Sequence, residues 1–84
     1  MQVYILRSKS TRRFYVGSTQ DVSNRVNEHN SGECLSTRFG IPWELIHVEE
    51  FANRADAMRR EQRIKSRGIA RYLKNVNNPL GGES

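Results

Sequence analysis

Two short runs of strand-forming residues, separated by a few polar residues, constrain the fold of this chain more than any other feature. The runs "QVYILR" (2–7) and "RFYVGS" (13–18) alternate in side-chain direction and flank the turn-forming "SKSTR". So short a connection predicts an antiparallel hairpin. If residues 8–11 form the loop, which is one of two or three possible registers, Tyr4 lies opposite Tyr15 and both side chains share one face of the sheet.

A helix is predicted almost directly after the second strand. Ser18 and Asp21 have the spacing of a capping box, which predicts a helix that starts near residues 19–21 and ends at about Asn30, before a glycine. Residues 31–42 predict a loop, because two glycines and a proline interrupt them.

The C-terminal half predicts one more strand and two more helices. "WELIHVEEF" (43–51) is typical of a strand, and its alternation places Trp43, Leu45 and His47 on one face and Ile46 and Val48 on the other. Residues 53–67 predict a helix capped by Asn53 and closed by Gly68, and residues 69–74 predict a short last helix. The remaining residues, 75–84, predict a disordered tail.

The length and composition predict one globular domain, over residues 1–74 of the 84. No run approaches the 18 apolar residues of a membrane span, and the N-terminus lacks the pattern of a signal peptide. The single cysteine, Cys34, excludes an intramolecular disulfide and a metal cage built from cysteines. It fits a reducing compartment, so we expect a cytoplasmic protein.

Charge is distributed unevenly along the chain, although the formal net charge is only +5. Residues 1–30 carry five Lys or Arg against two acidic residues, residues 31–51 carry one against four, and residues 52–74 carry eight against two. The last helical region is therefore a positive patch. Its expected partners are polyanions, nucleic acid before an anionic membrane.

The first predicted helix turns two basic or titratable side chains toward its apolar side. Val22 and Val26 mark the buried arc, and Arg25 and His29 fall on the same side. An arginine at the edge of a core can lay its stem over apolar neighbours, which is the structural explanation. A site for an anionic ligand is the functional one.

The second long helix turns a carboxylate inward. Glu61 falls within the arc that holds Ala57 and Ile64, with Lys65 one turn further on, whereas Arg59, Arg60 and Arg63 lie on the opposite side. A buried carboxylate is costly unless it is paired or binds a metal. Glu61 therefore forms either a salt bridge to Arg25 or part of a metal or phosphate site.

Gly17 ends the second strand pattern just before the first helix. A glycine in a strand often marks close approach by a ligand or by another part of the chain, and the start of a helix favours anions. A bulge or tight packing explains the glycine equally well.

Together these residues give the chain a resemblance to the GIY-YIG nuclease superfamily, in its small stand-alone bacterial type. "VYI" (3–5) and "YVG" (15–17) stand where the family has its two name motifs, with valine in place of a glycine and of an isoleucine. "STQDVSNRVNEHNSG" resembles the family's first helix, and "ADAMRREQRIK" resembles a later helix that carries a metal-binding glutamate. The likeness covers residues 2–73, and its site residues match Arg25, His29, Glu61 and Lys65.

The resemblance implies an α+β fold, with a small three-stranded antiparallel sheet flanked by helices. It also implies that the protein is an endonuclease that hydrolyses DNA phosphodiester bonds with one divalent ion, Mg²⁺ or Mn²⁺, in DNA repair, recombination or processing. Glu61 would hold the metal, and Arg25 would stabilise charge that develops on the phosphate.

The resemblance also implies roles for two tyrosines and a histidine. Tyr4 would be the general base and Tyr15 would orient the water or the phosphate, or the two roles would be exchanged. A tyrosine has a pKa of about 10, so it needs neighbouring cations to lower it. His29 would relay the proton, whereas His47 is expected to be structural.

DNA would be held mainly through its phosphate backbone. Thr37 lies in the loop that would border the DNA, and the candidate contacts are Gly17, Arg38, Arg59, Arg63, Lys65 and Arg67. Two other classes stay open: a nucleic-acid-binding module of the same fold without catalysis, and a protein-interaction domain that uses its basic helix. Binding alone needs no inward glutamate, which argues against the first of these.

Overall fold

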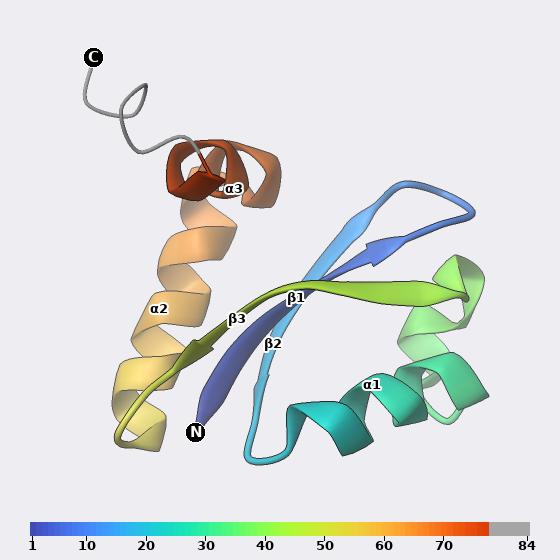
Figure 1. Ribbon diagram of the computed structural model, residues 1–84, viewed down its shortest axis with the longest axis horizontal. Coiled ribbons are helices and arrows are strands. Elements are labelled where there is room, and N and C mark those ends of the chain that lie inside the picture. Colours follow the sequence, from blue (N-terminus) through green and yellow to red (C-terminus); the bar gives the residue numbers. More distant parts are fainter. Residues whose placement is uncertain (78–84) are drawn as a thin grey trace.

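The chain folds into one antiparallel sheet with helices on both of its faces (Figure 1). The computed structural model describes residues 1–77, with side chains as far as Lys74. The strands are β1 (Gln2–Ser8), β2 (Phe14–Thr19) and β3 (Trp43–Glu50), in the order β2-β1-β3. The predicted α+β class and three-stranded antiparallel sheet are confirmed.

The helical segments are α1 (Val22–Ser31), the 3₁₀ helix η1 (Leu35–Gly40), α2 (Arg54–Arg67) and α3 (Ile69–Asn77). The predicted loop 31–42 therefore contains a helix that the sequence pattern missed. The last helix continues to Asn77, three residues into the predicted tail, and residues 78–84 of that tail lie outside the described residues. Within residues 1–77, no helix is long and apolar enough to cross a membrane.

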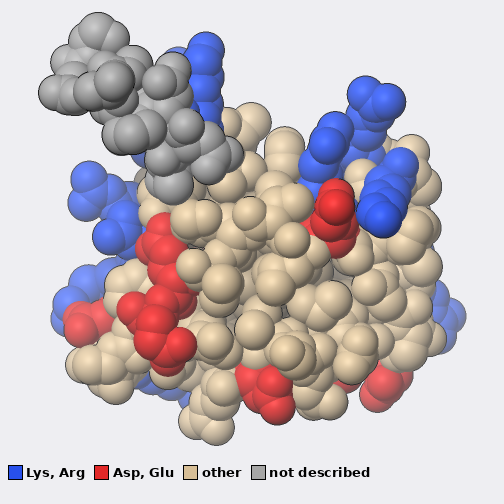
Figure 2. All heavy atoms as spheres, viewed as in Figure 1, with Lys and Arg blue, Asp and Glu red and all other residues tan. Residues whose placement is uncertain are grey.

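Charged side chains gather at the rim of the molecule in this orientation, and the middle of the face shown is mostly uncharged (Figure 2).

The two helix starts explain part of the chain path. Asp21, not Ser18, caps α1, because its side chain accepts a hydrogen bond from the Asn24 amide at 3.1 Å. Asn53 caps α2 as predicted, accepting from the Asp56 amide at 2.9 Å.

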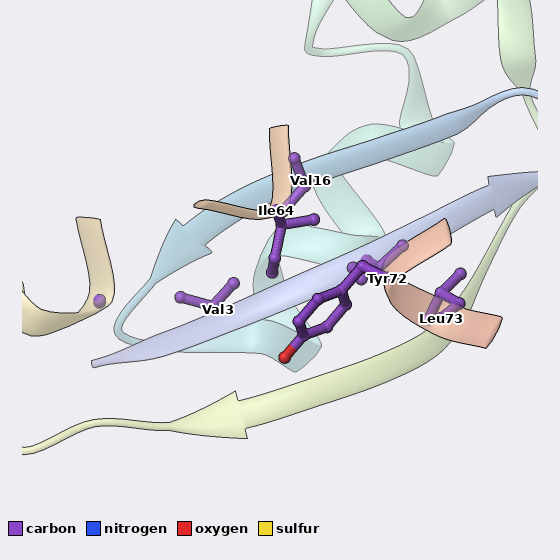
Figure 3. Close-up of a cluster of buried hydrophobic side chains, with 7 residues drawn as sticks. Val3, Val16, Ile64, Tyr72 and Leu73 are labelled. Carbon is purple, nitrogen blue, oxygen red and sulfur yellow. The ribbon is translucent and has the colours of Figure 1, made fainter. Parts of the chain in front are cut away.

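The central strand β1 is buried on both faces, so its side chains alternate between two cores. Val3 and Ile5 face α2 and α3, in the core shown in Figure 3, which also holds Val16, Ala57, Ile64, Tyr72 and Leu73. Tyr4 and Leu6 face α1, in a core with Trp43, Tyr15, Val22, Val26 and Ile41. The two predicted functional tyrosines therefore lie on the α1 side of the sheet.

The hairpin register differs from the prediction by two residues. Tyr4 lies opposite Gly17, and Tyr15 lies opposite Leu6. The turn is longer than predicted, with Arg12 in the left-handed region at φ 66° and the Ser8 amide bonded to the Arg13 carbonyl. A shift of two residues keeps each side chain on its face, so the prediction that the tyrosines share a face is confirmed.

Strand β3 contains an irregularity that changes which side chains share a face. Ile5 pairs with His47 but Leu6 pairs with Leu45, which leaves Ile46 as an extra residue. The predicted grouping of His47 with Trp43 is wrong, because the extra residue reverses the alternation beyond it. His47 instead contacts Tyr72 of α3, with their ring centroids 5.9 Å apart.

Candidate active site

A buried hydrogen bond between Tyr4 and His29 forms the centre of the site. Tyr4 comes from β1 and His29 from the last turn of α1, and the phenol oxygen lies 3.1 Å from Nε2 of the imidazole. Tyr4 is 1% exposed and His29 is fully buried. On its other side the His29 ring meets Thr37 of η1, with 2.8 Å between Nδ1 and the hydroxyl oxygen.

We assign the direction of these hydrogen bonds from the partners of Thr37. If the Thr37 hydroxyl donates to the carbonyl of Cys34, which lies 3.3 Å away, its oxygen accepts from Nδ1–H of His29. In that tautomer Nε2 has no proton and accepts from the hydroxyl of Tyr4. The unprotonated nitrogen of His29 therefore faces the phenol proton.

Both groups are held neutral near pH 7. Burial raises the pKa of Tyr4 to about 12, although the approach of Arg25 opposes the shift. Burial also lowers the pKa of His29 below its usual 6.5, and the charge of Arg25 adds to that effect. The expectation that neighbouring cations lower the pKa of Tyr4 is wrong for the protein without its substrate, because desolvation outweighs the cations.

Tyr15 and Arg25 surround this pair. Tyr15 is half-buried, with its ring 5.0 Å from that of His29 and 6.3 Å from that of Tyr4. The Arg25 guanidinium forms an ion pair with Glu28 at 2.8 Å and keeps 38% of its side chain exposed. Of the two alternatives for Glu61, the salt bridge to Arg25 is not formed, because Glu28, three residues along the same helix, is a nearer partner for Arg25.

Glu61 reaches the edge strand β2 from the other side of the sheet. Its Oε1 accepts a hydrogen bond from the Ser18 hydroxyl at 3.0 Å, and its Oε2 pairs with the Lys65 ammonium at 2.9 Å. The side chain is 18% exposed. Ser18 follows Gly17 directly, and consecutive strand residues point to opposite faces, so Glu61 and the tyrosines flank the same stretch of β2.

Gly17 gives the two tyrosines their room. A β carbon at this position would lie 2.7 Å from the Tyr4 hydroxyl oxygen and 3.1 Å from the Tyr15 ring. Of the explanations given for the glycine, tight packing is the one observed, and β2 pairs with β1 without a bulge. Its predicted role in DNA binding stays a prediction.

Glu61 suits a hard divalent cation that keeps most of its coordination for water and substrate. Within the described residues, no three His, Cys, Asp or Glu side chains cluster as a metal site. Mg²⁺ is often bound by one or two carboxylates plus substrate phosphates, so a single carboxylate is compatible with it. The Lys65 ammonium at Oε2 shows that this oxygen already attracts a cation.

Residues 1–75 match the family model described as the GIY-YIG catalytic domain. The chain belongs to the GIY-YIG family.

Relatives support the assignment across most of the GIY-YIG domain. A UPF0213 protein of Halobacterium salinarum is 45% identical over 64 residues, which cover 75% of this chain and 82% of that protein. A UPF0213 protein of Natronomonas pharaonis is 40% identical over 80 residues, covering 94% and 93%. The structure-specific endonuclease subunit slx1 of Schizosaccharomyces pombe is 35% identical over 78 residues, covering 84% of this chain and 29% of that protein. No solved structure matches the chain significantly.

Thr37 and Ser18 of this GIY-YIG domain make contacts that differ from those predicted. Thr37 was expected to border the DNA, but it is 2% exposed and lies behind His29. Ser18 was expected to cap α1, but it donates to Glu61. No sequence signal connected Thr37 with His29, because their contact depends on the unpredicted helix η1.

The predicted DNA contacts of the GIY-YIG domain are mostly exposed, apart from Gly17. Arg59 pairs with Asp56 at 2.8 Å and is 78% exposed, and Arg38 donates to the Gly32 carbonyl at 2.8 Å. Arg63, Lys65 and Arg67 of α2 are also exposed. Arg60 does not point outward as predicted, because it pairs with Glu49 at 3.3 Å and lies over the Phe51 ring.

Proposed function

We propose that this GIY-YIG protein is a divalent-metal-dependent endonuclease that hydrolyses phosphodiester bonds of DNA. The observation that supports this most is the buried chain of hydrogen bonds from Tyr4 through His29 and Thr37 to the Cys34 carbonyl. A module that only binds DNA needs no unprotonated imidazole nitrogen aimed at a buried phenol. The slx1 relative is named as a subunit of a structure-specific endonuclease, which agrees with a role in DNA repair or processing.

The proposed reaction uses the hydrogen bond between Tyr4 and His29 as a path for a proton. As the Tyr4 hydroxyl takes a proton from the attacking water, it passes its own proton to Nε2 of His29, so no free phenolate has to form against the raised pKa of Tyr4. Of the two tyrosines, Tyr4 is the better candidate for the base, since its hydroxyl contacts His29. Tyr15, which is more exposed, would orient the water or the phosphate.

Arg25, and a cation held by Glu61, would stabilise the negative charge that develops during the reaction. The exposed part of the Arg25 guanidinium can grip two phosphate oxygens and stabilise the charge that develops on them. Glu61 would hold one Mg²⁺ or Mn²⁺, and the bound ion would supply Lewis-acid stabilisation of the leaving oxygen. Ser18 would keep the Glu61 carboxylate in position at the β2 edge.

Replacing Glu61 by glutamine tests this proposal. The amide keeps the volume and an acceptor for Ser18 but loses the anionic ligand, so we expect single-turnover cleavage with Mg²⁺ to fall at least about a hundredfold, as for other lost sources of transition-state charge stabilisation. DNA binding and the melting temperature should be nearly unchanged. Glu50→Gln is the matched control, because Glu50 is 71% exposed on β3.

The outcomes separate the proposed enzyme from its alternatives. Wild-type-like cleavage by Glu61→Gln would remove Glu61 from the site. A wild-type protein that binds DNA with strong salt dependence but cuts neither duplex, single-stranded, nicked nor branched DNA would instead indicate a binding module.

A further inference from the structure

The tip of the β1–β2 hairpin carries a group of basic side chains that the proposed reaction does not use. Arg7, Lys9 and Arg12, here called the hairpin cluster, line a hollow of about 220 Å³ together with Ser8 and Glu44. Figure 2 shows Lys and Arg side chains around one acidic side chain at the upper right, where Figure 1 places the hairpin. The hollow has three cationic groups for one carboxylate.

The cations of the hairpin cluster are not neutralised inside the described part of the protein. The side chains of Arg25, Arg59, Arg60 and Lys65 all form ion pairs with acidic residues. Within residues 1–74, no salt bridge or side-chain hydrogen bond is made by the three members of the cluster. Arg7 and Glu44 are partners in the β1–β3 register, yet no salt bridge joins them. The cluster is therefore available to an external anion.

The backbone of Arg12 has a conformation that suits a residue other than arginine. Its φ of 66° lies in the left-handed region, which disfavours any side chain with a β carbon and suits glycine or asparagine. The turn is closed by backbone bonds, from the Arg12 amide to Ser8 and from the Ser8 amide to Arg13. The fold does not need this guanidinium.

The hairpin cluster lies at one end of the edge strand that also borders the candidate active site. Arg12 precedes β2, and Gly17 lies five residues further on, or about 17 Å at 3.3–3.4 Å per residue. DNA rises 3.4 Å per nucleotide along one strand, so this length is about five nucleotides. The opposite edge strand, β3, carries Glu44, Glu49 and Glu50 and no Lys or Arg. β2 itself carries no charged residue, so β3 repels a polyanion and β2 does not.

We propose that the hairpin cluster binds a backbone phosphate of the DNA substrate, about five nucleotides from the bond that is cut. This inference rests on the proposed function, because it places a second anchor on the same substrate. The contact is to phosphate only and reads no base.

The test is DNA binding by Arg12→Gly, Arg12→Lys and the control Val48→Glu, measured by fluorescence anisotropy on a labelled duplex without divalent metal, between about 50 and 300 mM salt. A lost phosphate contact should lower the log–log salt slope by about 0.9 and weaken binding about fivefold at 0.15 M salt. We expect this for Arg12→Gly, with a melting temperature equal to or above that of wild type, because glycine relieves the left-handed conformation. Arg12→Lys keeps the charge and should bind within about twofold of wild type.

Val48→Glu lowers the net charge by one on β3, away from the positive patch, where Val48 is 44% exposed, and should leave the salt slope within error of wild type. An unchanged slope for Arg12→Gly would overturn the hairpin contact and leave the proposed nuclease intact. An equal loss in Val48→Glu would also overturn it, by showing that only net charge matters. A wild-type protein that neither binds nor cuts DNA would overturn the proposed function itself.

Discussion

At the scale of single residues, Thr37 has the clearest indirect role in the site. Its hydroxyl oxygen accepts from His29 Nδ1, which leaves Nε2 to accept from Tyr4. Valine has nearly the same shape as threonine but no hydrogen-bond acceptor, so in Thr37→Val the Nδ1–H tautomer of His29 loses its partner. We expect cleavage at neutral pH to fall about tenfold, part of the 10²–10⁴-fold that general base catalysis contributes. Thr37→Ser keeps the hydroxyl and should cleave at close to the wild-type rate.

A pH profile distinguishes this positioning role from a purely structural one. The pKa of His29 is lowered by burial and by Arg25, so the neutral base persists down to pH values below about 6.5 before cleavage is lost. Thr37→Val also removes a partner of the doubly protonated ring, so its acidic limb should move to still lower pH. A lower cleavage rate at neutral pH without a shift of the acidic limb of the pH profile would mean that Thr37 only supports packing.

Sequence periodicity predicted correctly that Arg25 and His29 share one helix face and that Tyr4 and Tyr15 share one face of the sheet. The helical spacing of Arg25 and His29 from Val22, and the strand parity of Tyr4 and Tyr15, are insensitive to errors of two residues in register. The contacts of Glu61 were not predictable in this way. Its partners, Ser18 and Lys65, depend on how α2 lies against β2.

At the scale of elements, α3 is fixed to the sheet by a polar group of side chains. Tyr72 donates a hydrogen bond to Glu49, which also contacts His47 at 2.7 Å and Arg60 at 3.3 Å. Burial alone would raise the pKa of Glu49, but the bonds from His47 and Tyr72 and the charge of Arg60 outweigh it and lower the pKa. The carboxylate is therefore stabilised by its partners, on the opposite side of the sheet from Tyr4.

Tyr72→Phe should destabilise the protein without affecting cleavage. Loss of a hydrogen bond to a charged group costs about 1.5–3 kcal/mol of unfolding free energy, measured by denaturant at pH 7. The stabilisation of Glu49 is present above its unfolded pKa near 4.5 and is lost as pH falls through the lowered folded value. The difference between the variant and wild type should therefore shrink in acid. A slower cleavage rate in a folded Tyr72→Phe would contradict the separation of this group from the site.

The elements that the sequence did not predict all depend on local backbone irregularity. The extra residue at Ile46 and the left-handed Arg12 have no signature such as a glycine or an asparagine at those positions. Helix η1 lies in a segment where glycines and a proline predicted only a loop. Capping residues, by contrast, have a direct chemical signature: Asn53 caps α2 as predicted, and α1 begins at Val22, close to the predicted start, although Asp21 and not Ser18 caps it.

At the scale of the whole molecule, we expect the uneven distribution of charge to orient the protein on its proposed substrate. Arg59 and Arg63 line a hollow of about 290 Å³ on α2, beside Phe51. Reversing both charges should lower the log–log salt slope of DNA binding by up to about two, for all sequences alike. Reversal of Arg71 and Lys74 on α3, the other helix of the positive patch, changes the net charge equally and shows how the phosphate contacts are divided between the two helices. An unchanged slope in the double variant of Arg59 and Arg63 would mean that α2 makes no phosphate contact.

The central claim, that Arg25 and its neighbours form a phosphodiesterase site, is tested most directly by single-turnover DNA cleavage with wild type and Arg25→Lys. Lysine keeps the charge and can still pair with Glu28, so the fold and DNA affinity should change little. It cannot reproduce the two-pronged grip of a guanidinium on a phosphate. We predict a loss of about a hundredfold in rate, or about 3 kcal/mol in the transition state. A variant that melts normally and cuts within about threefold of wild type would contradict the account.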